Sequence, residues 1–368
     1  MSAPFFQLKK DEMQKRLKRL QEYLVFLGVD ACILEDPYDL YYFTGLSLSY
    51  GRLWVHKKKA ALFVDPRYIE IATKSSYVEP VLLLKEENEK NFLKTIRPEK
   101  ITFDGATLSY MRSYELQKFL ERCQIPFTLI AKERLTSQVR MIKDPFEIKE
   151  IKASANILTK VFLHLRRTIK EGMSEMDVAR EFEIYLRQCG AESAAFEPII
   201  AFGKNSAMPH YRAGRTKLKK DSIVLLDLGV VYGKYHSDMT RVLFHGVPNP
   251  VLLRLASVVK KAHRAALLLC KPGTKIGALD EAVRIEMRKE NMEEYFTHAL
   301  GHGIGLETHE PPRLRFDSKD KDLELRAGMV IAIEPGLYLP GKGGIRWEDM
   351  VLITKNGYEM LTGGSKKQ

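Results

Sequence analysis

At 368 residues the chain is longer than one average domain, so we expect two domains that each bury a core. Hydrophobic residues make up 45% of the sequence and charged residues 29%, a composition that excludes a largely disordered protein. The formal net charge of +12 would suit an anionic partner, but the basic residues are interspersed with acidic ones, as in Lys149-Glu150-Ile151-Lys152. A solvated basic surface explains this charge as well, so we expect no nucleic-acid partner.

The cysteines and the apolar runs indicate the compartment. Cys32, Cys123, Cys189 and Cys270 show no CxxC spacing, so we expect reduced core thiols. Residues 1–10 lack the long apolar stretch of a signal peptide, and no uncharged apolar run approaches the roughly 20 residues that span a bilayer. We therefore expect a cytoplasmic protein with no membrane partner.

The N-terminal third of the chain alternates helical and strand patterns. It opens with an amphipathic helix that ends at Gly28 and carries an apolar stripe of Met13, Leu17, Leu20, Leu24 and Leu27. A second helical pattern runs from Ser113 to Arg122. The predicted strands are Ala31 to Leu34, Ala60 to Val64, Val81 to Leu84, Ile101 to Phe103 and Phe127 to Ile130. This alternation predicts an α/β domain with a mixed sheet.

The pattern breaks between Lys132 and Pro145, where a long helical stretch begins. We place the boundary there, with an N-terminal α/β domain at 1–135 and a second domain at 136–368.

The second domain carries an internal duplication. A long helix that ends at Glu171-Gly172 is followed by a helix to Gln188, and a long helix that ends at Pro272-Gly273 is followed by a helix to Lys289. Each helix pair precedes β-rich sequence with hairpins. The pattern predicts two related ααββ units about a pseudo-twofold axis, and an α+β class for the whole chain.

A hairpin between Ile223 and Phe244 brings two acidic residues together. Its strands flank Tyr232-Gly233, a plausible two-residue turn. A turn centred there makes Asp227 face Asp238, with Cβ atoms about 5 Å apart. Two like charges at that distance are destabilising unless a positive charge lies between them, and a cation is the simplest remedy.

A second hairpin repeats this arrangement. Its turn is Pro340 to Gly344, and its centre near Gly341 makes Glu334 face Glu348. A single acidic residue in a strand is more often structural. Two facing pairs in the two halves of a duplicated domain favour a functional site.

A glycine-rich segment adds a histidine. His302 lies between Gly301 and Gly303, and three histidines fall between 298 and 309. Imidazole is the commonest neutral metal ligand. Four carboxylates and one histidine can hold two divalent cations, most readily Mn²⁺, Co²⁺ or Fe²⁺, with Zn²⁺ also open.

These residues resemble the metallopeptidase family of aminopeptidase P, prolidase and methionine aminopeptidase, which has the pita-bread fold. The resemblance runs from about Pro145 to Leu361. The motifs that carry it are Asn205 to His210, Leu226 to Gly229, His236 to Arg241, His298 to Gly305, Thr308 to Glu310, Ile333 to Gly336 and Gly344 to Asp349.

The resemblance implies a role for each metal ligand. Asp227 would chelate one metal ion, and Asp238 and Glu348 would bridge both. His302 and Glu334 would complete the coordination of the other ion.

The resemblance also implies catalytic and substrate-binding residues. His210 and His309 match the family's two catalytic or substrate-stabilising histidines, and Glu334 is the candidate general base. His298 and Arg346 match positions that line the proline-directed site.

One position departs from the family pattern. Trp347 stands where a smaller aliphatic residue is usual, and it should face away from the metals if strand alternation holds.

The N-terminal domain indicates which members of the family the chain resembles most. Asp36 to Gly45 resembles the first domain of aminopeptidase P and prolidase, which methionine aminopeptidases generally lack. Creatinase shares this architecture without metals, and the complete ligand set argues against it.

The resemblance therefore implies a metal-dependent aminopeptidase that hydrolyses the Xaa-Pro bond at the N-terminus of proline-containing peptides through a water activated by two metals. The alternatives are a prolidase restricted to Xaa-Pro dipeptides and a non-enzymatic pita-bread binding protein. By analogy with the family, a homodimer is also open.

Overall fold

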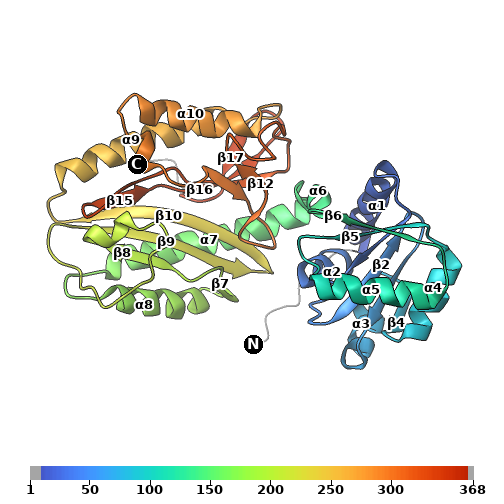
Figure 1. The fold of residues 1–368 in the computed structure, drawn as a ribbon. Helices are drawn as coiled ribbons and strands as arrows, with labels where there is room; N and C mark the ends of the chain where they lie inside the picture. Colours follow the sequence, from blue (N-terminus) through green and yellow to red (C-terminus); the bar gives the residue numbers. More distant parts are fainter. Residues whose placement is uncertain (1–9, 364–368) are drawn as a thin grey trace. The chain divides into compact units, whose positions relative to one another are not determined.

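The computed structural model describes residues 10–363, and the chain forms two compact units, Met1–Arg140 and Met141–Gln368 (Figure 1). The boundary expected after residue 135 lies inside the first unit. The short helix α6 (Ser137–Arg140), which follows it, packs on α1 (Lys10–Phe26).

The first unit is a six-stranded mixed sheet in the order β4-β3-β2-β1-β5-β6. The strands are β1 (Ala31–Leu34), β2 (Gly51–His56), β3 (Ala60–Val64), β4 (Val81–Leu83), β5 (Lys100–Asp104) and β6 (Thr128–Lys132). β2 is antiparallel to both of its neighbours and the other pairs are parallel, which confirms the predicted mixed sheet.

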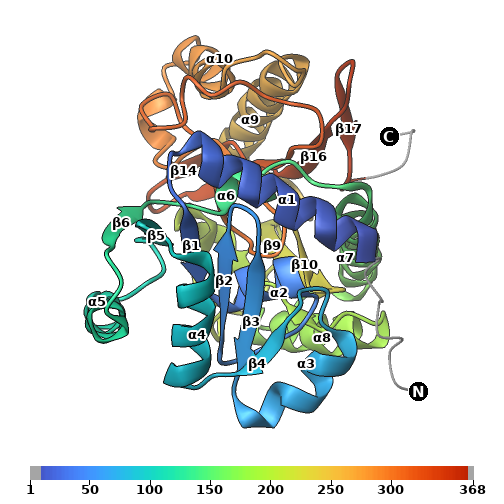
Figure 2. The ribbon, with the colours of Figure 1, turned by 90° about the vertical axis from the view of Figure 1, so that its right-hand side faces the viewer.

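Helices cover both faces of this sheet. Figure 2 shows α5 on one side and α1 on the other. The helices are α1, α2 (Pro37–Thr44), α3 (Ile69–Ser75) after the short η1 (Pro66–Tyr68), α4 (Glu86–Ile96), α5 (Tyr110–Cys123) and α6. Apolar side chains of α4 and α5 pack on the sheet in one core cluster.

Strand β2 was missed by the sequence analysis because a charged residue interrupts its apolar run. Arg52 is buried and its guanidinium contacts Glu35 and Glu89, each at 2.6 Å. The indole of Trp54 also donates to Glu89, at 2.9 Å. A buried ion pair therefore occupies a position where the sequence pattern predicts a solvent-exposed side chain.

Within the described residues, the second unit contains two helix pairs, two larger sheets and one two-stranded sheet. The helices are α7 (Pro145–Thr168), α8 (Glu175–Gln188), α9 (Pro250–Leu268) and α10 (Ile276–Arg288). One sheet holds β7 (Ser193–Ala194), β8 (Ile199–Phe202), β9 (Ser222–Tyr232) and β10 (Tyr235–His245). The other holds β11 (Gly301–Gly303), β12 (Glu310–Leu314), β13 (Val330–Ile333), β16 (Asp349–Ile353) and β17 (Tyr358–Met360). The shorter elements are β14 (Gly336–Leu339), which pairs with β15 (Gly343–Arg346), η2 (Gly203–Ala207) and η3 (Glu293–Tyr295).

The duplication expected from the sequence is visible in equivalent hydrogen bonds. After the first helix of each pair, the amide of Gly172 donates to Leu218 O and that of Gly273 to Leu325 O, both at 2.9 Å. Both glycines have a positive φ, 89° and 85°. The matching isolated bridges are Ser174 with Lys217 and Lys275 with Glu324.

The two halves meet where β10 lies beside β15 and β16. The amide of Glu348 donates to Thr240 O of β10 at 3.2 Å, which joins the halves at the backbone. Side chains of α7 and α8 pack on β8, β9 and β10 in one core cluster, and those of α9 and α10 pack on the second half in another (Figure 1).

Two structural observations concern the cysteines and the possibility of a membrane-spanning helix. All four cysteines are free thiols, and Cys32, Cys123 and Cys270 are buried. Within the part of the chain that the structure describes, no helix combines the length and apolar character needed to cross a bilayer.

We expect Phe182→Ala to lower the free energy of unfolding by about 3–5 kcal/mol because it leaves a cavity in the core between α8 and the sheet. Phe182 is fully buried there. Urea unfolding followed by circular dichroism would measure the change. The matched control is Ile184→Ala on the same helix, which is 55% exposed and should change stability by less than about 0.5 kcal/mol. Equal losses in the two variants would contradict the assignment of this core.

Candidate metal centre

The turn of the first hairpin differs from the predicted one. Tyr232 pairs with Tyr235, so the turn residues are Gly233 and Lys234 rather than Tyr232 and Gly233. Both have a positive φ, 57° and 71°, as a type I′ turn requires. Lysine is not a residue that signals this conformation, and the sequence analysis placed the turn one residue too early.

The predicted facing of Asp227 and Asp238 is therefore wrong. Asp227 lies opposite Thr240, and Asp238 lies opposite Gly229. The register differs from the prediction by two residues, an even number, so both carboxylates still project from the same face of the hairpin. They are diagonal neighbours instead of a facing pair.

The register predicted for the second hairpin is confirmed. One register runs through the β14-β15 and β13-β16 ladders, and it places Glu334 opposite Glu348. The pairs that define it are Gly336 with Arg346 and Ile333 with Asp349.

The strand that contains β13 and β14 is interrupted at Glu334, and the strand that contains β15 and β16 is interrupted at Glu348. At both residues the backbone amide donates a hydrogen bond to another segment. The amide of Glu334 donates to Leu300 O at 2.8 Å, beside the segment that carries His302. The amide of Glu348 reaches across to β10. These bonds anchor the acidic residues to the two elements that carry the other candidate ligands.

Three of the predicted ligands form a compact group. One ligand atom from each of Asp238, His302 and Glu348 lies within 4.8 Å of the others. His302 Nε2 is 3.9 Å from Asp238 Oδ2 and 3.8 Å from Glu334 Oε1. Glu334 therefore borders the same group.

Asp227 joins this cluster with an arginine as its partner. Arg346 Nη2 donates to Asp227 Oδ2 at 2.5 Å, and Arg346 is only 3% exposed. One guanidinium thus faces four carboxylates, so the cluster keeps an excess of negative charge.

The electrostatics of the carboxylates reflect that excess. Burial, together with the charges of Glu348 and other neighbouring carboxylates, raises the pKa of Asp238 and of Glu334 well above the ordinary range. Burial and the charge of Asp227 raise the pKa of Glu348 to about 8. Additional positive charge would favour the ionised forms of these three groups.

Unsatisfied oxygen atoms show that the residues fit a metal. Asp227 Oδ1, Asp238 Oδ1 and Glu348 Oε1 are buried and have no hydrogen-bond partner among the described residues. Buried polar atoms normally have a partner, because leaving one unpaired costs about 1–3 kcal/mol. Oxygen ligands with one imidazole suit divalent cations such as Mn²⁺, Co²⁺ or Fe²⁺.

The backbone around His302 is packed too closely for side chains at its neighbours. A Cβ at Gly301 would overlap Ala332 O, and a Cβ at Gly303 would overlap Pro311 O. His302 Nδ1 lies 3.0 Å from Gly303 O, which leaves Nε2 toward the carboxylates. Burial lowers the pKa of His302 to about 3, so the ring is neutral, as a metal ligand must be.

The two candidate catalytic histidines lie beside the cluster. The rings of His309 and His302 are 4.2 Å apart between centroids. Burial is the main cause of the lowered pKa of His309, and the charge of His210 adds to it. His210 is exposed, on the segment between η2 and β9.

Tyr338 links the two predicted substrate-binding residues and was missed by the sequence analysis. Its hydroxyl lies 2.9 Å from His298 Nε2 and accepts a hydrogen bond from Arg346 Nη1 at 2.7 Å. Strand alternation could have indicated it, because Tyr338 follows Glu334 by four residues on the same face of the hairpin.

Thr240 was also missed, although it lies two residues beyond Asp238 on the same strand. Its hydroxyl donates to Glu348 Oε2 at 2.8 Å and accepts from Arg346 Nε at 3.1 Å. It therefore holds one carboxylate and the arginine in place.

Trp347 faces away from the cluster, as strand alternation predicts. Its ring lies between Arg241 and Lys260, 4.5 Å and 4.6 Å from the centroid, and its indole donates to Asp349 at 3.2 Å. It packs against the core of the second half of the domain.

Comparisons with known proteins find a matching family model for each unit of the chain. The model of metallopeptidase family M24 matches residues 149–355, and that of the creatinase/prolidase N-terminal domain matches residues 16–142. The Xaa-Pro dipeptidase of Pyrococcus furiosus is 35% identical over 352 residues, which cover 95% of this chain and 98% of that protein.

Solved structures extend the likeness to the fold. The Xaa-Pro dipeptidase from Bacillus anthracis has a TM-score of 0.89 at 33% identity, over 96% of this chain and 99% of that one. The X-Pro aminopeptidase from Thermotoga maritima MSB8 has a TM-score of 0.83 at 30% identity, over 94% and 99%. Together these findings confirm the predicted α+β class and the pita-bread resemblance.

We expect Asp238→Asn to stabilise the metal-free protein, because it removes one of four clustered negative charges. The same change should abolish stabilisation by added Mn²⁺, which for the unchanged protein should reach about 2.7 kcal/mol at a hundredfold excess over Kd. Thermal unfolding in EDTA and in Mn²⁺ would measure both effects.

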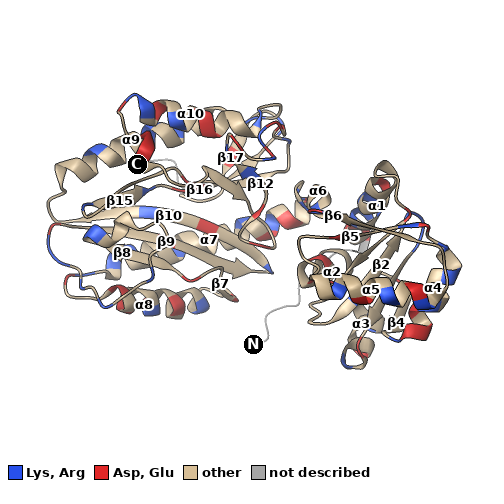
Figure 3. Cartoon of the chain, viewed as in Figure 1, with Lys and Arg blue, Asp and Glu red and all other residues tan. Residues whose placement is uncertain are grey.

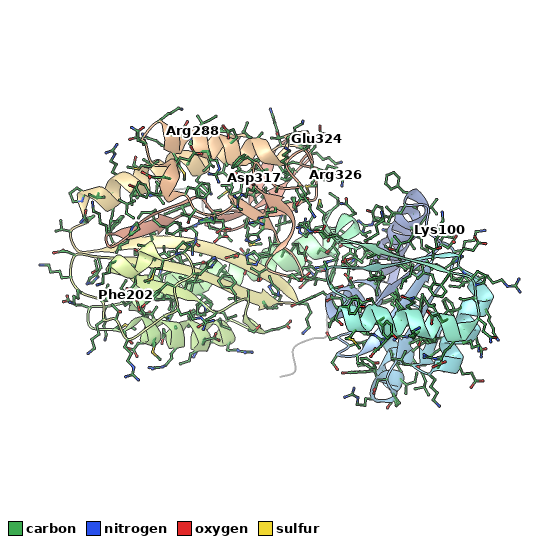
Figure 4. The ribbon with its side chains drawn as sticks, viewed as in Figure 1. Lys100, Phe202, Arg288, Asp317, Glu324 and Arg326 are labelled. Carbon is green, nitrogen blue, oxygen red and sulfur yellow. The ribbon has the colours of Figure 1, made fainter. Side chains whose placement is uncertain are left out.

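The matched control for this experiment is Asp317→Asn. Asp317 is an exposed acid paired with Arg315 on the surface (Figure 4), so the metal response should be unchanged. An undiminished Mn²⁺ response in Asp238→Asn would refute the metal centre.

Proposed function

This chain belongs to metallopeptidase family M24, and on that premise we propose that it is a hydrolase that cleaves Xaa-Pro dipeptides with the help of two divalent cations. The observation that carries the proposal is the convergence of buried carboxylates with three unpartnered oxygen atoms around His302. Structural acids would have their oxygens satisfied by hydrogen bonds or by an equal number of cationic groups.

The preference for dipeptides over longer peptides has two supports. The Pyrococcus furiosus and Bacillus anthracis relatives are both named Xaa-Pro dipeptidases. In addition, the proline of an Xaa-Pro dipeptide carries the free C-terminal carboxylate. The buried guanidinium of Arg346 lies beside the cluster and can bind such a group. The aminopeptidase that the sequence analysis put first is the second candidate, because the Thermotoga maritima X-Pro aminopeptidase has the same fold.

The assignment of ligands follows the sequence analysis. Asp227 would hold one cation, Asp238 and Glu348 would hold both, and His302 with Glu334 would hold the other. Mn²⁺ suits this oxygen-rich set best, and Co²⁺, Fe²⁺ and Zn²⁺ are the alternatives.

The bound cations would supply a water of lowered pKa that is nucleophilic near neutral pH. Glu334 would accept the proton of that water at its carboxylate. His309 would stabilise the developing oxyanion at the carbonyl before proline, and His210 would contact the substrate backbone or the leaving group.

The substrate-binding residues would orient the proline end of the peptide. Arg346 would receive its carboxylate, and Tyr338 would fix the relative positions of Arg346 and His298 through its hydroxyl. Because Arg346 and Tyr338 are buried, His298 is half-buried, and the three are joined by hydrogen bonds, they are preorganised before substrate binds.

A non-enzymatic protein that binds nucleic acid finds little support. Figure 3 shows lysines and arginines dispersed among acidic residues in both units, without a continuous basic face in that view. A homodimer and a cytoplasmic location stay predictions from the sequence.

We expect the protein to release alanine from Ala-Pro at least about tenfold faster than from Ala-Pro-Ala, because only the dipeptide places a carboxylate within reach of Arg346. Chromatography of the products would measure the two rates. Treatment with EDTA should abolish both activities, and added Mn²⁺ should restore them.

The control peptide Ala-Ala tests the requirement for proline and should not be cleaved at a comparable rate. Faster cleavage of Ala-Pro-Ala would favour the aminopeptidase. Turnover that persists in metal-stripped protein would exclude the metal-dependent mechanism altogether.

A further inference from the structure

A second buried carboxylate site lies outside the metal cluster, at the start of α8. Glu175 is the first residue of that helix and is 0% exposed. Its carboxylate accepts four hydrogen bonds. The donors are Phe202 N (2.8 Å) and Asn205 Nδ2 (2.9 Å) to Oε1, and Tyr211 Oη (2.7 Å) and Gly214 N (3.0 Å) to Oε2.

All four donors are uncharged, and no described residue forms an ion pair with Glu175, so hydrogen bonds and the N-terminus of α8 stabilise the carboxylate. A buried carboxylate is costly when its hydrogen bonds are lost. The groups that supply those bonds are therefore held firmly around Glu175.

Those groups come from the segment that carries His210. Asn205 precedes it by five residues, Tyr211 follows it directly, and Gly214 lies four residues beyond. Figure 4 shows Phe202 where β8 ends and this segment begins.

The same segment is tied to the metal cluster on its other side. Ser206 Oγ accepts a hydrogen bond from the amide of Gly344, at 2.9 Å, and Pro209 O accepts one from Arg346 Nη1, at 3.4 Å. The segment is thus held between Glu175 and β15. His210 itself has no hydrogen-bond partner among residues 10–363, so its position depends on its backbone.

We infer that Glu175 is a positioning residue that fixes His210 for contact with the substrate, although it lies outside the metal cluster. The inference rests on the proposed function, in which His210 contacts the substrate backbone or the leaving group. Loss of the Glu175 hydrogen bonds would leave the metal ligands in place and displace the segment that carries His210.

The test is Glu175→Gln, which keeps the shape of the side chain and removes its charge. Each carboxylate oxygen accepts one backbone amide, Phe202 N or Gly214 N. Whichever way the glutamine turns, its own amide nitrogen faces one of those N–H groups and cannot accept from it. We expect kcat for Ala-Pro to fall about 10- to 100-fold, because a misplacement near 1 Å has an effect of that size.

The decisive measurement is the same substitution in a His210→Ala background. If Glu175 acts through His210, Glu175→Gln should lower kcat less than about twofold there. Equal losses with and without His210 would overturn the inference. Tyr211→Phe removes one donor without adding another, and it should show the same dependence on His210 if the inference holds, even if Glu175→Gln folds poorly.

Two further readouts separate this inference from the proposed function. The Mn²⁺-dependent rise in Tm should be preserved in Glu175→Gln, and its loss would show a general disruption of the site and contradict the inference. If the unchanged protein fails to cleave Ala-Pro with Mn²⁺, the proposed function itself fails. If cleavage is normal but His210→Ala has no effect, the function stands and the positioning inference falls.

Discussion

The second unit holds four carboxylates together against their mutual repulsion. Asp227 and Asp238 come from one half of the duplicated domain, and Glu334 and Glu348 come from the other. Among the described residues, the guanidinium of Arg346 is the cationic group that faces them, so bound cations would relieve the repulsion that remains. Each half of the domain supplies candidate ligands, and Asp238 and Glu348 meet at the seam between β10 and β16.

Hydrogen bonds around the cluster keep the charged groups in a binding arrangement. Thr240 holds Glu348 and Arg346 together, and Tyr338 connects Arg346 with His298. The segments that carry the two candidate catalytic histidines each contact a buried carboxylate. Glu175 holds the segment around His210. Glu310, next to His309, forms a buried ion pair with Lys143 at 2.9 Å. Rigid supports of this kind are what a preorganised active site requires.

The differences between prediction and structure have local causes. The register of the first hairpin was wrong because Lys234 adopts a positive φ that its side chain does not signal, whereas the second was right because one register continues through two ladders. β2 was missed because Arg52 is buried against two glutamates. Both errors involve a residue in an unusual conformation or environment, Lys234 or Arg52, that is stabilised by contacts with residues distant in the sequence.

The sequence by itself determined the duplication and the face from which each carboxylate projects, and its resemblance to a known family indicated the candidate catalytic and substrate-binding residues. The duplication and the faces follow from strand alternation and motif spacing, which are local. Only the tertiary structure decided the pairing of Arg346 with Asp227, 119 residues apart, the bridge made by Tyr338 and the support given by Glu175. Such contacts join residues far apart in the chain, and the spacing of residues along the sequence does not encode which of them come together.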